Sequence, residues 1–75
     1  PTRGLVTVSV RAKKPSTATV AVYDMTGRVM QSQSFNVFEG ANTKQLDLGT
    51  YNKGVYNVLV INGAEKQSIK IILDK

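Results

Sequence analysis

The chain has 75 residues, the length of one small domain, and its 41% hydrophobic and 20% charged residues are typical of a globular protein. It has no histidine and no cysteine, which excludes Ser-His-Asp and Cys-His nucleophiles, thiolate chemistry and metal sites built from these residues. Ten Lys and Arg against five Asp and Glu give a net charge of +5, a balance that favours acidic partners such as nucleic acid, anionic lipid or an anionic polysaccharide.

The charged residues are spread along the chain. A calcium loop needs several oxygen ligands within about twelve residues, and the carboxylates are too widely spaced for one. We therefore expect no metal site, no cofactor and no catalytic residue. Arg11, Lys13 and Lys14 form one short basic cluster, but no aromatic residues are interleaved with it. We interpret it as solvated surface charge and expect no nucleic-acid partner.

Hydrophobic residues alternate with a period of two, and Val, Ile and Thr are abundant, which favours strands. The pattern predicts six short strands and no long helix. They cover residues 5–10, 18–23, 28 to about 38, 42–48, 55–61 and 66–73. The third segment is long enough to be bent or bulged. Short strands at intervals of about ten residues predict an antiparallel β-sandwich or barrel.

The first predicted turn is Asp24-Met25-Thr26-Gly27. Asp at the first position caps such a turn, and Gly at the fourth accepts a positive φ, as in a type I turn followed by a bulge. This closure places Val22 opposite Met30 and Tyr23 opposite Val29. Apolar side chains then meet on both faces of the hairpin.

The second predicted turn has two possible registers. An Asn62-Gly63 loop pairs Val58 with Gln67, whereas a Gly63-Ala64 loop pairs Val58 with Ile69. We prefer the second register because it buries more apolar surface and because Gly at the first position suits a type II′ turn.

Four segments carry a resemblance to a known family. They are residues 1–4 (Pro-Thr-Arg-Gly), 22–29 (Val-Tyr-Asp-Met-Thr-Gly-Arg-Val), 46–56 (Leu-Asp-Leu-Gly-Thr-Tyr-Asn-Lys-Gly-Val-Tyr) and 70–72 (Lys-Ile-Ile). In this order and spacing the chain resembles the C-terminal sorting domain of the type IX (Por) secretion system of Bacteroidota. Family members open with Asn-Pro-x-x-Gly, carry a Tyr-Asp/Asn-x-x-Gly-Arg/Lys-Val hairpin, continue with Leu-x-x-Leu-x-x-Gly-Val-Tyr, and end in a Lys-rich apolar strand.

The departures from the family pattern are small. The opening Asn is not in the chain, which fits a cut just before Pro1. Tyr51 and Asn52 stand where members often have Leu and Pro. Residues 73–75 follow the Lys-Ile-Ile stretch, where many members stop.

The resemblance implies an Ig-like antiparallel β-sandwich of six to seven short strands. It implies that residues 1–75 are a single sorting domain cut from a larger secreted precursor, and that the domain is not an enzyme. Such a domain directs a covalently linked N-terminal cargo through the outer-membrane translocon and is removed by a sortase-like cysteine protease. Its partners would be the translocon and the shuttle proteins of the outer membrane. The cargo would pass the periplasm and reach the outer membrane, the cell surface or the medium.

The resemblance also suggests recognition residues. They are Gly27, Arg28, Gly54, Val55, Tyr56, Lys66, Lys70, Ile72 and Lys75. Several have a structural alternative. Gly27 supplies the positive φ that its turn needs, Gly54 serves the turn into the next strand, and Tyr56 shares a face with Val58 and Val60 and is expected in the core. Arg28 is expected to pair with Asp24.

The final strand, residues 66–73, is expected to be a sheet edge that the export machinery extends or grips. Lys66 and Lys70 would face outward and protect this edge from self-pairing, and Ile72 would be an exposed apolar residue. An edge-strand dimer is a further expectation. The alternative function is an Ig-like accessory or carbohydrate-binding module of a secreted hydrolase.

Overall fold

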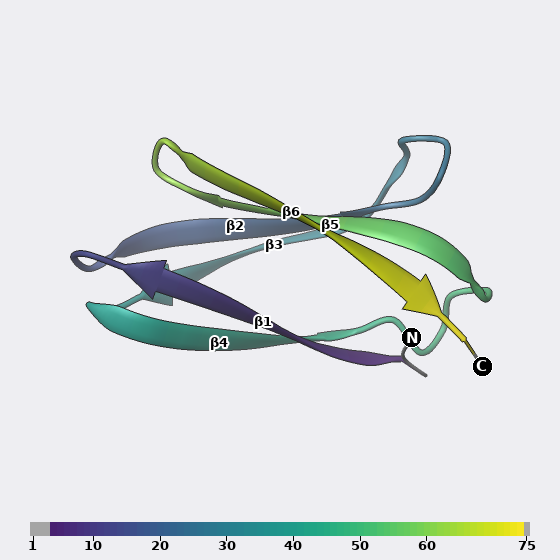
Figure 1. The fold of residues 1–75 in the computed structure, drawn as a ribbon, viewed down its shortest axis with the longest axis horizontal. Helices are drawn as coiled ribbons and strands as arrows, with labels where there is room; N and C mark the ends of the chain where they lie inside the picture. The colour runs from purple at the N-terminus through teal and green to yellow at the C-terminus, as the bar shows by residue number, and fades with distance from the viewer. Residues whose placement is uncertain (1–3, 75) are drawn as a thin grey trace.

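The structure, a computed structural model, describes residues 4–74 and contains six antiparallel strands (Figure 1). They are β1 (Leu5–Ala12), β2 (Ser16–Tyr23), β3 (Val29–Val37), β4 (Gly40–Asp47), β5 (Gly54–Asn62) and β6 (Glu65–Leu73). β1 and β4 form a two-stranded sheet, and the other strands form a four-stranded sheet in the order β3-β2-β5-β6. The all-β Ig-like sandwich is confirmed. Between residues 4 and 74 there is no helix of the length and apolarity that spanning a membrane requires.

The β5–β6 hairpin adopts the preferred register. Val58 lies opposite Ile69, and Asn62 lies opposite Glu65, which leaves Gly63 and Ala64 as the loop. Gly63 has φ of 64°. Ala64 has negative φ, since no residue other than glycine has positive φ in the described chain. Positive φ at the first loop residue alone is what a type II′ turn requires.

The β2–β3 hairpin confirms one predicted pairing and corrects the other. Tyr23 lies opposite Val29, but Val22 lies opposite Gln31 and not opposite Met30, because a bulge shifts the register between Val22 and Tyr23. The straight register would turn Phe35 and Val37 outward. The extra residue reverses the alternation of β3, so that Val37 is buried and Phe35 packs against the core.

The core lies between the sheets and consists of alternating residues from their facing sides. Its fully buried large side chains are Val8, Val20, Val22, Val37, Leu46, Leu48, Val58 and Leu73. In the described chain no polar or charged residue is buried. The apolar alternation therefore selects the inner face of each strand.

Two strands cover four, so both sides of the sandwich are partly open. On one side Gln33 donates to Gln31 Oε1 (2.8 Å), and Gln31 donates to the Tyr51 hydroxyl (2.9 Å). On the other side β6 turns Ile69 and Ile71 toward the core, where they remain half-buried. Side-chain hydrogen bonds bridge the polar side, and the packing of Ile69 and Ile71 covers the β6 side.

The loops gather at the two ends of the long axis, which measures 36 Å (Figure 1). We call one end the terminal end. It holds Gly4, the turn at 24–28, the loop at 48–53 and the last residues of β6, on the right of Figure 1. We call the opposite end the far end. It holds the loops at 13–15, 38–39 and 63–64.

Candidate recognition site

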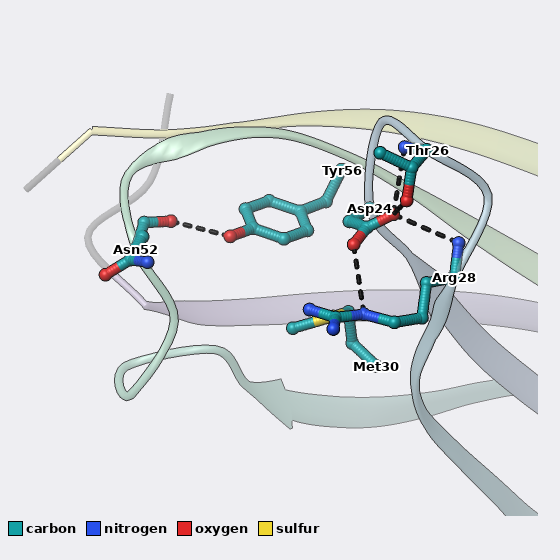
Figure 2. Close-up of polar contacts among 6 residues, drawn as sticks. All are labelled: Asp24, Thr26, Arg28, Met30, Asn52 and Tyr56. Carbon is teal, nitrogen blue, oxygen red and sulfur yellow. Dashed lines mark hydrogen bonds and ion pairs between the residues drawn. The ribbon is translucent and has the colours of Figure 1, made fainter.

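The turn at 24–28 is organised around one carboxylate oxygen. Asp24 Oδ1 accepts hydrogen bonds from the Thr26 hydroxyl (2.6 Å), the Thr26 backbone N–H (2.9 Å) and the Arg28 backbone N–H (3.0 Å) (Figure 2). The Gly27 N–H donates to the Asp24 carbonyl (3.1 Å), and Gly27 has φ of 88°. This confirms the type I turn with a glycine at positive φ.

The pKa of Asp24 lies below its usual value of 3.8. The largest cause is the hydrogen bond from the Thr26 hydroxyl, and the backbone N–H groups of Arg28 and Thr26 and the Arg28 charge act in the same direction. The expected ion pair is present, with Arg28 Nε 3.3 Å from Asp24 Oδ2. The Arg28 side chain is 72% exposed, and its guanidinium also lies 3.7 Å from Met30 Sδ. Arg28 is therefore both positioned and accessible to a partner.

Tyr56 holds the loop at 48–53. Its side chain is 7% exposed, and its hydroxyl donates to the Asn52 carbonyl (2.7 Å), as Figure 2 shows. Its ring packs against Tyr51 with 5.5 Å between centroids. The predicted core position of Tyr56 is confirmed. The hydroxyl contact also shows that the residue anchors the loop.

Close backbone approach fixes the other side of this loop. The Leu48 N–H donates to the Gly4 carbonyl (2.7 Å), and a Cβ on Gly4 would lie 3.0 Å from the Gly49 Cα. A side chain at position 4 would push the two backbones apart, which explains a glycine there. The Gly49 N–H donates to Asp47 Oδ1 (2.8 Å), so the loop is hydrogen-bonded where it leaves β4.

The structure brings most of the predicted residues to one end. The turn at 24–28 and the start of β5 line a shared shallow depression, whose residues are Asp24, Met25, Thr26, Lys53, Gly54, Val55 and Tyr56. Val55 lies opposite Ile72 and Asn57 opposite Lys70, so the end of β6 lies beside this depression. Gly27 and Arg28 belong to the same end.

Two predicted residues do not join this group. Lys66 lies opposite Ile61, near the start of β6 and about 20 Å along the strand from Ile72. Lys75 lies outside the described residues. The sequence did not predict the roles of Thr26, which donates to Asp24, and of Asn52, which accepts from Tyr56. A Thr two residues after the Asp of a predicted turn is a signal for the contact between Thr26 and Asp24.

Aromatic side chains do not form an exposed row. Tyr56 is buried, Tyr23, Phe35 and Tyr51 are half-buried, and Phe38 is exposed. A flat aromatic platform for sugar stacking would need several exposed rings, so the carbohydrate-binding alternative gains no support from this surface.

The fold and the arrangement of its turns define a small antiparallel β-sandwich domain. Comparison with protein families then identifies it. The family described as "Secretion system C-terminal sorting domain" matches residues 1–74, so the chain belongs to this family, the C-terminal sorting domains of type IX secretion. Domains of this family are in general non-catalytic tails of cargo proteins that interact with the type IX machinery. Neither the comparison with curated proteins nor the comparison with solved structures found a match.

Proposed function

We propose that this chain is a single, non-catalytic domain that directs a covalently linked N-terminal cargo through the type IX outer-membrane translocon. In this proposal translocon and shuttle proteins of the outer membrane bind the domain, and a sortase-like cysteine protease then removes it. The cargo passes the periplasm and ends at the outer membrane, at the cell surface or in the medium. Membership of the sorting-domain family supports the proposal.

The observation that carries the recognition step is the position of β6 at the edge of its sheet. Within the described residues β6 is hydrogen-bonded only to β5. An edge strand offers backbone groups to an incoming strand, and its alternate side chains supply specificity. Ile72 is 48% exposed on the outward face, at the terminal end, and lies opposite Val55. A translocon component that adds a strand to this edge would contact the apolar pair Val55 and Ile72, with Lys70 beside it.

Neighbouring residues complete the proposed surface in two ways. Arg28 offers an exposed guanidinium at the same end, held by Asp24. Gly27, Gly54 and Tyr56 shape the turn and loop beside it. Lys66 and Lys70 are exposed on β6 and oppose pairing of this edge with a second copy, because like charges placed opposite each other repel. Edge-to-edge dimers are therefore expected only at high protein concentration.

A fusion experiment tests the proposal. A fluorescent reporter with a signal peptide, a linker and this domain is expressed in a Bacteroidota strain with a working type IX system and in one without. Surface or medium localisation in the competent strain alone, with loss of the domain, is the expected result. Retention in the periplasm of both strains, with the domain attached, would contradict the proposal.

Two matched double variants test the role of the β6 edge. Lys70→Ala/Ile72→Ser alters the outward face at the terminal end, and Lys66→Ala/Ser68→Ala alters the same face of the same strand at the far end. All four side chains are exposed, so both variants should fold, which far-UV circular dichroism checks. The first variant should block export and the second should not. Equal export of both variants would end the edge hypothesis while leaving the sorting function standing.

A further inference from the structure

The far end differs in chemistry from the terminal end, and the proposed sorting function does not use its loops. Strand register brings its three loops together, since Ala12 lies opposite Gly40, Ser16 opposite Val37, and Ala18 opposite Asn62. The loops at 13–15, 38–39 and 63–64 therefore form one surface, on the left of Figure 1.

Four exposed cations lie on this surface. They are Arg11, Lys13, Lys14 and Lys66. Arg11 and Lys66 line one shallow depression between β1 and β6, and Arg11, Lys13 and Lys14 line the adjacent one. Among residues 4–74 one ion pair has an N–O distance within 4.0 Å, and it joins Arg28 to Asp24 at the terminal end. None of the four cations therefore forms an ion pair with a described residue. Their charge is available to a partner.

The charge balance favours an extended anionic surface over a small anion. Glu39 and Glu65 also lie at this end, so four cations against two carboxylates leave an excess of two positive charges. Glu65 lines both depressions. A carboxylate inside each depression disfavours a bound phosphate ion there, because like charges repel at short range. A broad anionic surface instead contacts the cations collectively.

A single aromatic side chain projects from the same surface. Phe38 is 67% exposed on the turn between β3 and β4. Asn42 fixes this turn, because its Oδ1 accepts from the Phe38 N–H (2.9 Å) and its Nδ2 donates to the Phe38 carbonyl (2.8 Å) and the Gly40 carbonyl (3.2 Å). The exposure of Phe38 therefore belongs to a hydrogen-bonded turn and is not a consequence of a loose loop.

We propose that the far end binds the surface of an anionic lipid bilayer. Phe38 enters the interface between headgroups and acyl chains, and Arg11, Lys13, Lys14 and Lys66 lie among the anionic headgroups. Basic residues near an anionic leaflet and an apolar side chain in the interface are the two contributions that hold peripheral proteins at membranes. A nucleic-acid site would need several stacking aromatics along a basic groove, and this end offers one ring. Bound in this way, the domain would point its terminal end away from the bilayer.

Vesicle co-sedimentation of the 75-residue chain tests the proposal. The chain should bind vesicles of equal parts phosphatidylcholine and phosphatidylglycerol, should not bind pure phosphatidylcholine vesicles, and should dissociate as salt is raised. Each lysine near an anionic leaflet is worth about fivefold in partitioning, so Lys13→Gln/Lys14→Gln should lower binding about 25-fold. Lys53→Gln/Lys70→Gln removes the same charge from the terminal end and should lower binding by less than about threefold.

A second matched pair tests the aromatic contact. Phe38→Ser should lower vesicle binding about tenfold, since it removes an apolar side chain from the interface. Met25→Ser, which removes a side chain that is 76% exposed at the terminal end, should leave binding unchanged. Far-UV circular dichroism of each variant confirms that it is folded.

Four results would overturn the proposal. One is an equal loss of vesicle binding in both lysine pairs, which would indicate net charge alone. Another is unchanged binding of Phe38→Ser. The third is displacement from vesicles by inorganic phosphate at constant ionic strength, which would reassign the site to free phosphate. The fourth is tight binding to duplex DNA that Lys13→Gln/Lys14→Gln abolishes, which would reassign the site to nucleic acid. None of these outcomes involves the translocon, so they leave the sorting proposal unaffected.

Discussion

The two ends of this sandwich are stabilised in different ways, although one core lies beneath both. At the terminal end a carboxylate, a buried tyrosine hydroxyl and a glycine–glycine approach fix the turn at 24–28 and the loop at 48–53. At the far end the Asn42 amide fixes one turn and a hydrogen bond from the Ser16 hydroxyl to Asn62 Oδ1 (2.8 Å) joins β2 to β5, while the charged side chains form no ion pair within the described residues. The segments that resemble the sorting-domain family lie mainly at the terminal end.

This difference suggests a division of roles. A surface whose shape depends on several internal hydrogen bonds presents one geometry to a partner, which suits specific recognition. A surface of unpaired cations around one apolar side chain depends on charge and area more than on geometry, which suits a membrane. The variants below test whether the ends are separable in function while they remain coupled in folding.

The largest effect is expected from a cavity in the shared core. Leu48 is fully buried where the chain leaves β4, and Leu48→Ala should lower the free energy of unfolding by about 2–5 kcal/mol. A domain of this size has little stability to lose, so the variant should be largely unfolded at 37 °C, as monitored by far-UV circular dichroism. Leu5→Ala, at a position that is 62% exposed, is the control and should stay folded.

Urea unfolding of the parent chain tests whether the two ends unfold cooperatively. Backbone amide signals of Lys14 at the far end and Thr26 at the terminal end should disappear at the same urea concentration, because both ends rest on one small core. Separate midpoints for the two signals would mean that the ends unfold independently, and that their chemical difference extends to folding.

A pair of glycine variants distinguishes stability from recognition. Gly27 has φ of 88° and Gly40 has φ of 101°, and a Cβ at either position would meet no atom within 4 Å. Gly27→Ala and Gly40→Ala should each cost about 1–2 kcal/mol through backbone strain alone. Thermal denaturation should therefore give similar losses, whereas reporter export should fall mainly for Gly27→Ala. Equal export defects would assign both effects to stability.

The hairpins show how far the sequence predicts this fold. The β5–β6 register was predicted correctly, because local alternation and Gly63 favour the same pairing. The pairing of Val22 with Met30 was wrong, since the bulge is required to bury Val37 between two sheets. That requirement depends on residues far along the chain, which a hairpin's own pattern does not contain.

The candidate site shows the same limit. The Asp24 turn and the core position of Tyr56 follow from local patterns, and both were predicted. The gathering of the turn at 24–28, the start of β5 and the end of β6 depends on strand pairing across the sheet. The sequence pattern does not contain this pairing, so it placed Lys66 and Ile72 in one recognition surface, although they lie at opposite ends of β6. The role of Asn42 in holding Phe38 outward was also missed.

A smaller effect is expected from the hydroxyl of Tyr56. Tyr56→Phe keeps the ring against Tyr51 and removes the hydrogen bond to the Asn52 carbonyl, which should cost about 0.5–1.5 kcal/mol. Tyr23→Phe is the matched control, because the Tyr23 hydroxyl makes no hydrogen bond within the described residues, and its midpoint in urea should not change. If both variants behave alike, the loop at 48–53 is held by packing and not by the hydroxyl.

The smallest effect concerns acid stability and again compares the two ends. The pKa of Asp24 is lower in the folded chain than its usual value of 3.8, so the ionised carboxylate stabilises the turn at pH values above about 4. This contribution is lost as the pH falls through the folded pKa. Asp24→Asn should therefore be less stable than the parent chain at pH 7, and the difference should shrink on acidification below pH 4, as followed by thermal denaturation. Glu39→Gln, which removes a carboxylate from the far end, provides the comparison. A constant difference between Asp24→Asn and the parent at all pH values would mean that the hydrogen bonds of the turn do not depend on the charge of Asp24.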